Sequence, residues 1–439
     1  MSMFIDFPKT NAIIQGLDSF NIPPMCMVHQ EYDANYIKDV RAAVVAELAK
    51  LPCKDTLAGK NICITVGSRG IPYLDVMVKA MCDTLKAWGA KPFIIPAMGS
   101  HGGGNAEGQL EILNGYGITE EAMEVPIKAS MEVVQYGEFN GIPLYCDKYA
   151  FESDGIVLFN KVKPHTDFRG AHESGLLKMI AIGIAKHKGA AFFHTFGFPS
   201  FPQLIPPVAE IFLQKCPVAF GVGVVQNAFD DICTIKACMP EDIIATDAEL
   251  LVEAKEKIAK FLFNDIDLLI IDEIGKNISG NGHDPNVTGR NLDGSFQREL
   301  NLKKLFIRGL TPESHHNGCG LAAADITLRS VLNDVDWDMT WTNGLTTGIF
   351  NSCKIPFYAE NDDRAIRTCL KALWGMNPED ARIVHVKNTL ELSNIQVSRK
   401  LYESIKDLPG ISLCENQAGA EKLEFDADGN MKEIEWDKY

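Results

Sequence analysis

The segment Asn61-Ile-Cys-Ile-Thr-Val-Gly-Ser-Arg-Gly-Ile-Pro72 begins with apolar and β-branched residues and ends in a glycine-containing loop, the pattern of a buried strand followed by a turn. Apolar residues at helical spacing then predict a helix over Tyr73–Trp88, which Gly89 ends. A second strand is expected at Phe93–Pro96, before the loop Ala97-Met-Gly-Ser-His-Gly-Gly-Gly104. This alternation predicts an α/β fold with a mainly parallel sheet and helices on both faces.

The alternation recurs along the rest of the chain. Strands are expected at Gly155–Phe159, Val218–Val225, Asp267–Ile271, Leu305–Arg308, Ile355–Ala359 and Arg382–Val386, and helices at Leu176–Ala191, Thr246–Phe263, Ala322–Leu332 and Arg364–Trp374. With 439 residues, the chain is long enough for two domains. We expect an N-terminal cofactor-binding α/β domain at 1–263, a C-terminal α/β domain at 264–415, an active-site cleft between them, and a C-terminal hairpin extension at 416–439.

Composition narrows the classes of function. The net charge of −16 disfavours nucleic-acid binding and membrane-surface binding. The 12 cysteines include no Cys-x-x-Cys pair, so reduced thiols are expected rather than a zinc ribbon or an iron–sulfur site. The first residues lack a basic region before an apolar one, and no apolar run is long enough to span a membrane, so a cytoplasmic protein is expected.

The candidate chemistry lies in loops that directly follow predicted strands. In open α/β sheets, ligands bind beyond the carboxyl ends of the strands. Lys178 stands among apolar residues, where an amine is readily desolvated and made nucleophilic. His194 is a candidate metal ligand, and His165 is a candidate acid or base. A covalent attachment point, a metal donor and a proton-transfer group together indicate a cofactor-dependent enzyme.

Three motifs, in this order and spacing, resemble those of the lactate racemase family of nickel-dependent α-hydroxyacid racemases and epimerases. They are Val66-Gly-Ser-Arg69-Gly-Ile-Pro72, then Ala97-Met-Gly-Ser-His101, then His165 followed by Ser174-Gly175-x-x-Lys178 and His194. Val66, Gly70 and Leu176 differ from the family pattern, which marks a distant branch and leaves the substrate undefined.

The resemblance implies a nickel-pincer nucleotide attached covalently to Lys178, with nickel bound by His194. It implies that the pincer ring accepts the hydride of the substrate α-carbon and returns it to either face, so that the configuration inverts. His101 and His165 would exchange the proton of the substrate hydroxyl, and His172 competes with His165 for that role. The remaining expected contacts are to substrate at Arg69, Arg169 and His172, and to cofactor at Ser68, Ser174 and Gly175.

The second domain offers a long polar loop after the strand predicted at Asp267–Ile271. It runs from Lys276 to Arg290 and is rich in glycine and polar residues. We expect this loop to face the substrate, with a catalytic role for Lys276; a long mobile loop is the alternative.

The expected partners are a small anionic α-hydroxy acid and the enzymes that make the cofactor, and homo-oligomerisation is left open. One alternative is a lyase, dehydratase or hydrolase that uses a simple divalent metal on the same scaffold. Another is a non-enzymatic sensor of an anionic metabolite. The sensor is disfavoured because binding alone requires neither paired histidines nor a buried lysine.

Overall fold

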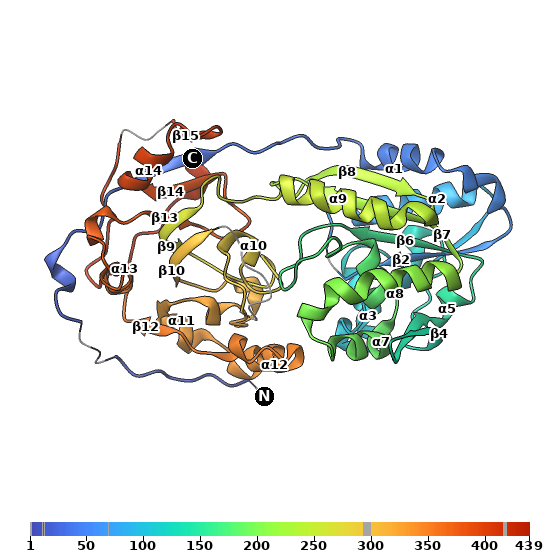
Figure 1. Ribbon diagram of the computed structural model, residues 1–439, viewed down its shortest axis with the longest axis horizontal. Coiled ribbons are helices and arrows are strands. Elements are labelled where there is room, and N and C mark those ends of the chain that lie inside the picture. Colours follow the sequence, from blue (N-terminus) through green and yellow to red (C-terminus); the bar gives the residue numbers. More distant parts are fainter. Residues whose placement is uncertain (1, 11, 13, 69, 293–299, 416–418) are drawn as a thin grey trace. The chain divides into compact units, whose positions relative to one another are not determined.

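The computed structural model describes residues 2–10, 12, 14–68, 70–292, 300–415 and 419–439, and it divides into two compact units (Figure 1). Unit 1 consists of Met1–Tyr32 and Ala259–Tyr439, and unit 2 consists of Asp33–Ile258. The α/β fold class with mainly parallel sheets is confirmed. Within the described residues, every helix is too short or too polar to cross a lipid bilayer.

Unit 2 is built on a sheet with the strand order β3-β2-β6-β7-β8. Its strands β3, β2, β6 and β7 are parallel, and β8 is antiparallel to β7. A separate hairpin pairs β4 with β5. The bounds are β2 (Asn61–Val66), β3 (Lys91–Pro96), β4 (Val133–Phe139), β5 (Ile142–Asp147), β6 (Gly155–Lys161), β7 (Val218–Gln226) and β8 (Ile232–Cys238).

Helices cover both faces of this sheet. Helices α1 (Val40–Ala49) and α2 (Leu74–Ala87) share one apolar core with strand residues such as Ile64 and Val222. Helix α9 (Ile243–Lys257) packs on β7 at Gly223, where an added Cβ would lie 2.4 Å from Cδ1 of Leu250. The remaining α-helices of unit 2 are α3 (Ala106–Gly115), α4 (Glu120–Met123), α5 (Lys148–Phe151), α6 (Leu176–Lys178), α7 (Lys186–His194) and α8 (Phe201–Lys215).

The helix expected over Leu176–Ala191 is interrupted. Helix α6 runs directly into a π-helical turn, η4 (Met179–Gly183), and α7 begins only after a break and extends to His194. We refer to Leu176–His194 as the interrupted helix. A π-helical turn inside a helix is rare and is frequent at functional sites.

Unit 1 contains a mixed sheet with the order β12-β11-β10-β9-β13-β14-β1-β15. The strands from β12 to β13 are parallel, whereas β14, β1 and β15 are antiparallel to their neighbours. The bounds are β1 (Met25–Gln30), β9 (Asp265–Ile271), β10 (Asn301–Ile307), β11 (Ile326–Leu328), β12 (Phe357–Ala359), β13 (Ile383–Val386), β14 (Asn394–Ser398) and β15 (Ile411–Leu413).

The N-terminal residues therefore group with unit 1, which differs from the expected domain of residues 1–263. The reason is strand pairing, because β1 lies between β14 and β15 (Figure 1). The later boundary was expected near Phe263, whereas helix α9 ends at Lys257 and unit 2 ends at Ile258.

One helix predicted in unit 1 is wrong over its first residues. A helix predicted over Ala322–Leu332 is instead strand β11 followed by the shorter helix α11, because Ile326–Leu328 is buried between β10 and β12. Short apolar runs of this kind are ambiguous between strand and helix. The helices of unit 1 are α10 (Pro285–Thr288), α11 (Arg329–Asp334), α12 (Trp337–Thr347), α13 (Asp362–Lys371) and α14 (Arg399–Ile405).

The C-terminal segment folds back as a hairpin. Phe425 and Met431 form an antiparallel bridge, and the N–H of Gly429 donates to the carbonyl of Asp426 across the turn. The segment also joins the sheet edge of unit 1, because Met25 and Glu421 exchange backbone hydrogen bonds of 2.7 and 2.8 Å. It is therefore part of unit 1 rather than a separate extension.

Candidate active site

The site is built at the carboxyl edge of the unit 2 sheet. Parallel strands β2, β3 and β6 end at Val66, Pro96 and Lys161, so the loops that follow them leave from the same edge. The loop after β2 touches the interrupted helix, because a Cβ on Gly67 would lie 3.4 Å from Cε of Met179. The loop after β3 touches it as well, since the N–H of Gly99 donates to the carbonyl of Gly183 at 3.0 Å.

Lys178 and His165 are in direct contact. Nζ of Lys178 lies 2.6 Å from Nε2 of His165, whose ring is buried. The backbone N–H of Asp167 donates to Nδ1 of the same ring at 3.0 Å. Because Nδ1 accepts this bond, Nε2 is the ring nitrogen that faces the Lys178 amine.

Glu173 is the buried anchor of the loop that presents His165. Its carboxylate accepts from the backbone N–H of His165 at 2.7 Å and lies 2.6 Å from Nζ of Lys255. Arg169 bonds to the carbonyls of His165 and Phe168 and to Glu173 at 3.3 Å. These contacts of the Arg169 guanidinium therefore brace its own loop. The loop is closed at its base by a backbone bridge between Lys163 and Ser174.

His172 is directed to a different partner from His165. Its Nδ1 lies 2.9 Å from Oδ2 of Asp247, a buried residue of α9. The other carboxylate oxygen of Asp247 accepts from the N–H of Leu176 at 2.5 Å, at the start of α6. Gly175 is required beside it, because a Cβ there would lie 2.1 Å from Oδ1 of Asp247. The structure thus brings His165, and not His172, to Lys178.

His194 and His165 pack against the same aromatic ring, that of Phe198. The Phe198 ring is 5.7 Å from the ring of His165 and 5.5 Å from that of His194, measured between centroids. Phe201 lies 5.5 Å from the His194 ring on the same basis. Burial, and secondarily the charge of a protonated Lys178, lowers the pKa of His194 to about 4. The imidazole is therefore neutral at pH 7, with a lone pair for a metal.

His101 is held by the loop after β2. Its Nδ1 is hydrogen-bonded to Oγ of Ser68, and the carbonyl of Ser68 accepts from the hydroxyl of Tyr116 at 2.7 Å. The two motif loops thus support each other, and Nε2 is the nitrogen of His101 on the far side of the ring. Arg69, which was expected to bind the substrate carboxylate, lies outside the described residues.

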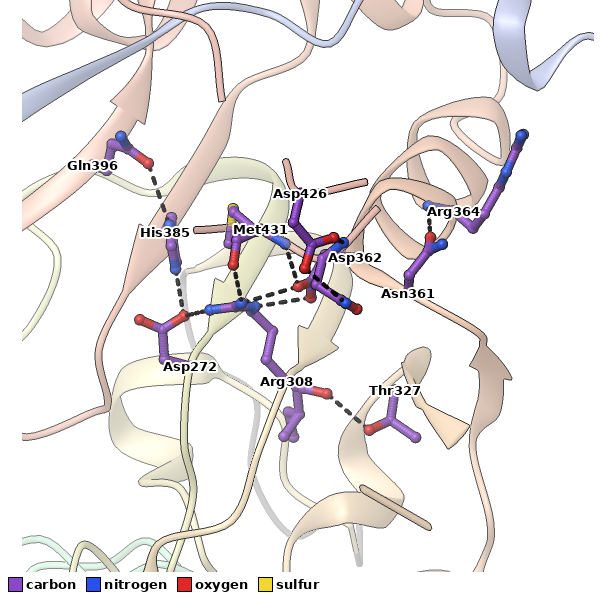
Figure 2. A network of polar contacts seen from close by, with 12 residues as sticks. Asp272, Arg308, Thr327, Asn361, Asp362, Arg364, His385, Gln396, Asp426 and Met431 are labelled. Carbon is purple, nitrogen blue, oxygen red and sulfur yellow. Dashed lines mark hydrogen bonds and ion pairs between the residues drawn. The ribbon is translucent and has the colours of Figure 1, made fainter. Parts of the chain in front are cut away.

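Lys276 belongs to unit 1, where its Nζ is hydrogen-bonded to Oδ1 of Asn343 on α12. The unit 1 sheet also has a carboxyl edge, where β9 and β10 end at Ile271 and Ile307. Four side chains near it point toward one another, those of Asp272, Arg308, Asp362 and His385 (Figure 2). Arg308 bonds to Asp272 and binds Asp362 through two hydrogen bonds of 2.9 and 3.0 Å, and His385 Nε2 lies 2.6 Å from Asp272. We call these four residues the Arg308 network.

Sequence reasoning missed the residues that orient the site. Glu173 and Asp247 are fully buried carboxylates that fix the loop and the start of α6, and Phe198 contacts both histidine rings. Glu173 could have been suspected, because it stands inside the motif between His172 and Ser174. Asp247 lies 71 positions from Leu176 and carries no local signal.

The described residues fit a cofactor that brings most of its own metal ligands. Lys178 offers an amine for covalent attachment, and His194 offers one neutral imidazole. Among the residues that the structure describes, no three His, Cys, Asp or Glu side chains gather into a set that could hold a metal ion. An organic ligand that supplies the other donors needs only one such side chain from the protein.

No protein-family model and no curated protein matches this sequence. Among solved structures, the chain is similar to the lactate racemase apoprotein from Thermoanaerobacterium thermosaccharolyticum, with a TM-score of 0.50 and 15% identity over 89% of this chain and 99% of that one. A protein of known structure from Thermotoga maritima matches 61% of this chain and 69% of its own length, with a TM-score of 0.44 and 16% identity. At this identity the first likeness is one of fold, and it spans both units: the chain has a lactate racemase-like fold.

Proposed function

We propose that this protein is a racemase or epimerase that inverts the α-carbon of a small 2-hydroxy acid, using a nickel-pincer nucleotide attached to Lys178. The observation that carries the proposal is the contact between Lys178 and His165, with His194 across Phe198, on a lactate racemase-like fold. A lysine amine, a neutral imidazole and a second histidine in one place match what such a cofactor needs.

The cofactor, when bound, supplies the hydride acceptor that no side chain can provide. Lys178 would hold it covalently, and His194 would bind nickel through the lone pair that its lowered pKa keeps available. Gly175 and the backbone of Ser174 border the attachment point, since they directly precede α6.

Two histidines are available for the substrate hydroxyl. We assign His165 rather than His172 as one base, because His165 contacts Lys178 whereas His172 is bound to Asp247. His101 is assigned as the other, with Ser68 fixing its Nδ1 so that Nε2 exchanges the proton. Arg69 remains assigned to the substrate carboxylate by the resemblance of its motif, and Lys276 remains assigned to catalysis by its place in the polar loop after β9.

Intact-mass spectrometry with metal analysis tests the proposal, on protein produced together with the enzymes that make the cofactor. We expect a mass increment on the peptide that contains Lys178 and near-stoichiometric nickel. Lys178→Ala should lose both. Lys188→Ala is the matched control, because Lys188 lies on α7 with its Nζ 4.5 Å from the Tyr145 ring centroid.

An unmodified wild-type mass, under conditions that load a lactate racemase, would contradict the assignment of the cofactor. Loading that persists in Lys178→Ala would contradict the assignment of the attachment point. A loaded protein can then be screened against the two enantiomers of short 2-hydroxy acids for loss of optical activity. His101→Ala should keep the mass increment and lose about 100-fold or more in turnover.

A further inference from the structure

Lys186 lies on the interrupted helix between Lys178 and His194, and its side chain is fully buried. Its backbone is left-handed, with φ of 56°, a conformation that is uncommon and unfavourable for a residue with a side chain. Such a backbone persists where surrounding contacts determine it, and those contacts are often functional. A buried lysine at this break therefore needs a physical reason.

The Lys186 amine joins three segments of unit 2. Its Nζ lies 3.1 Å from Oδ2 of Asp147 at the end of β5, and it donates to the carbonyl of Pro96 at the end of β3. It also lies 3.5 Å from Oε1 of Gln109 on α3. Burial lowers the pKa of Lys186 and raises that of Asp147, and the attraction between the two groups opposes both changes.

Gln109 extends these contacts to the loop that follows β3. Its Nε2 donates to the carbonyl of Gly99 at 3.1 Å and to the carbonyl of His101 at 3.2 Å, and the side chain is fully buried. The same loop touches the interrupted helix directly, since a Cβ on Gly104 would lie 3.0 Å from Nδ1 of His187. A chain of polar contacts thus runs from Asp147 through Lys186 and Gln109 to the backbone of His101.

We propose that Lys186 is a positioning residue, which fixes the loop carrying His101 against the helical segment carrying Lys178 and His194, with Gln109 extending this contact to His101 itself. The inference rests on the proposed function for the role of those three residues. It explains why a buried lysine sits at the break in the helix. Displacing a reacting group by about 1 Å can cost about 100-fold in rate, so such a brace has a direct catalytic consequence.

The test is Gln109→Leu, compared with Gln135→Leu. Both glutamines donate to a backbone carbonyl, but Gln135 is exposed and bonds to Gly137. The readout is the rate at which diethyl pyrocarbonate modifies His101, measured by peptide mass spectrometry relative to the exposed His316 in the same molecules. Loss of the hydrogen bonds to the loop should raise the relative rate about fivefold, whereas Gln135→Leu should leave it unchanged.

A relative His101 rate in Gln109→Leu equal to that of wild type would overturn the inference. The double variant Lys186→Met/Asp147→Asn removes both buried charges together, so that neither remains unpaired, and it should raise the His101 rate as well. Amide hydrogen exchange separates a local effect from unfolding: residues 97–104 should exchange faster while α2 stays protected. None of these readouts needs a cofactor, so an absent mass increment at Lys178 would reject the proposed function and leave this result standing.

Discussion

The two units place polar residues at the carboxyl edges of their parallel strands in different ways. In unit 1, Arg308 contacts two carboxylates, and His385 contacts one of them, so basic and acidic groups alternate. In unit 2, Lys178 contacts the imidazole of His165, and burial keeps His194 neutral. The Arg308 network joins an arginine to two carboxylates, whereas the Lys178–His165 contact joins an amine to an imidazole.

The C-terminal segment, residues 419–439, also bonds to the Arg308 network. Met431 donates its N–H to Asp362 at 2.7 Å and accepts from Arg308 at 3.3 Å (Figure 2). The indole N–H of Trp436 donates to Asp272 at 3.0 Å. Position at a carboxyl edge is therefore not enough to mark a ligand site. In the Arg308 network the polar groups bond to one another and to the C-terminal segment of the same chain.

The largest expected effect comes from removing the central charge of the Arg308 network. Arg308→Met leaves Asp272 and the buried Asp362 without their arginine partner. This loss should lower the free energy of unfolding by about 3–5 kcal/mol. Urea unfolding measures this loss. Arg364→Met is the control, because Arg364 forms an exposed pair with Asp18 and should change stability by less than about 0.5 kcal/mol. Equal losses of unfolding free energy in the two variants would show that the Arg308 network contributes no more than an exposed ion pair.

The second prediction concerns the free energy of unfolding at acidic pH. Burial would raise the pKa of Asp272, but His385 and Arg308 outweigh it and lower that pKa from 3.8 to about 2. A carboxyl group with a depressed pKa in the folded state stabilises the protein above its unfolded pKa and loses that contribution as the pH falls. Between pH 4 and pH 2 the contribution should shrink by about 2 kcal/mol. Unfolding free energies across this window should fall less steeply in Asp272→Asn.

A third, smaller effect tests the C-terminal segment. Trp436→Phe keeps an aromatic ring beside His385, whose ring centroid lies 5.2 Å from that of Trp436, but it removes the N–H that bonds to Asp272. The expected loss is about 1 kcal/mol in the free energy of unfolding. Faster hydrogen exchange in residues 419–439 of this variant would place the effect in the C-terminal segment. Unchanged exchange there would argue that the indole N–H contributes nothing to holding it.

The smallest expected change in stability is at the unit 2 site. Lys178→Met replaces a half-buried amine by an apolar group of similar length, and it removes the contact with the His165 imidazole. We expect the free energy of unfolding to stay within about 1 kcal/mol of wild type. A loss comparable to that of Arg308→Met would show that Lys178 is a structural residue, in conflict with the proposed function.

The sequence predicted the parallel strands well because their signal is local. β2 has the predicted bounds, and β6 and β7 extend the predicted strands by two residues and one. Strand β1 was missed as part of unit 1, because its partners lie near the other end of the chain. Helix α8 was also missed, since Pro206 and Pro207 lie inside it and argue locally against a helix.

The sequence pointed to two side chains of the candidate site but not to the residues that hold them in place. His165 and Lys178 stand in recognisable motifs, and the structure brings them into contact. The choice between His165 and His172 depended on Asp247, which reaches them only through the packing of α9. Lys186 looked like one of several basic residues in a helix, and only its burial and left-handed backbone distinguish it.

The pairing of β1 with β14 has a consequence for the order of folding during synthesis. His29 is bonded to Asn394, 365 positions later, so β1 leaves the ribosome long before its neighbours exist. At about 5–20 residues per second this delay is roughly 20–70 s. Unit 2 is a continuous stretch and has all its strands within that interval. The segment 25–30, mostly buried in the finished protein, must therefore stay unpaired while unit 2 folds, which is the period when a nascent chain is most exposed to strand-mediated aggregation.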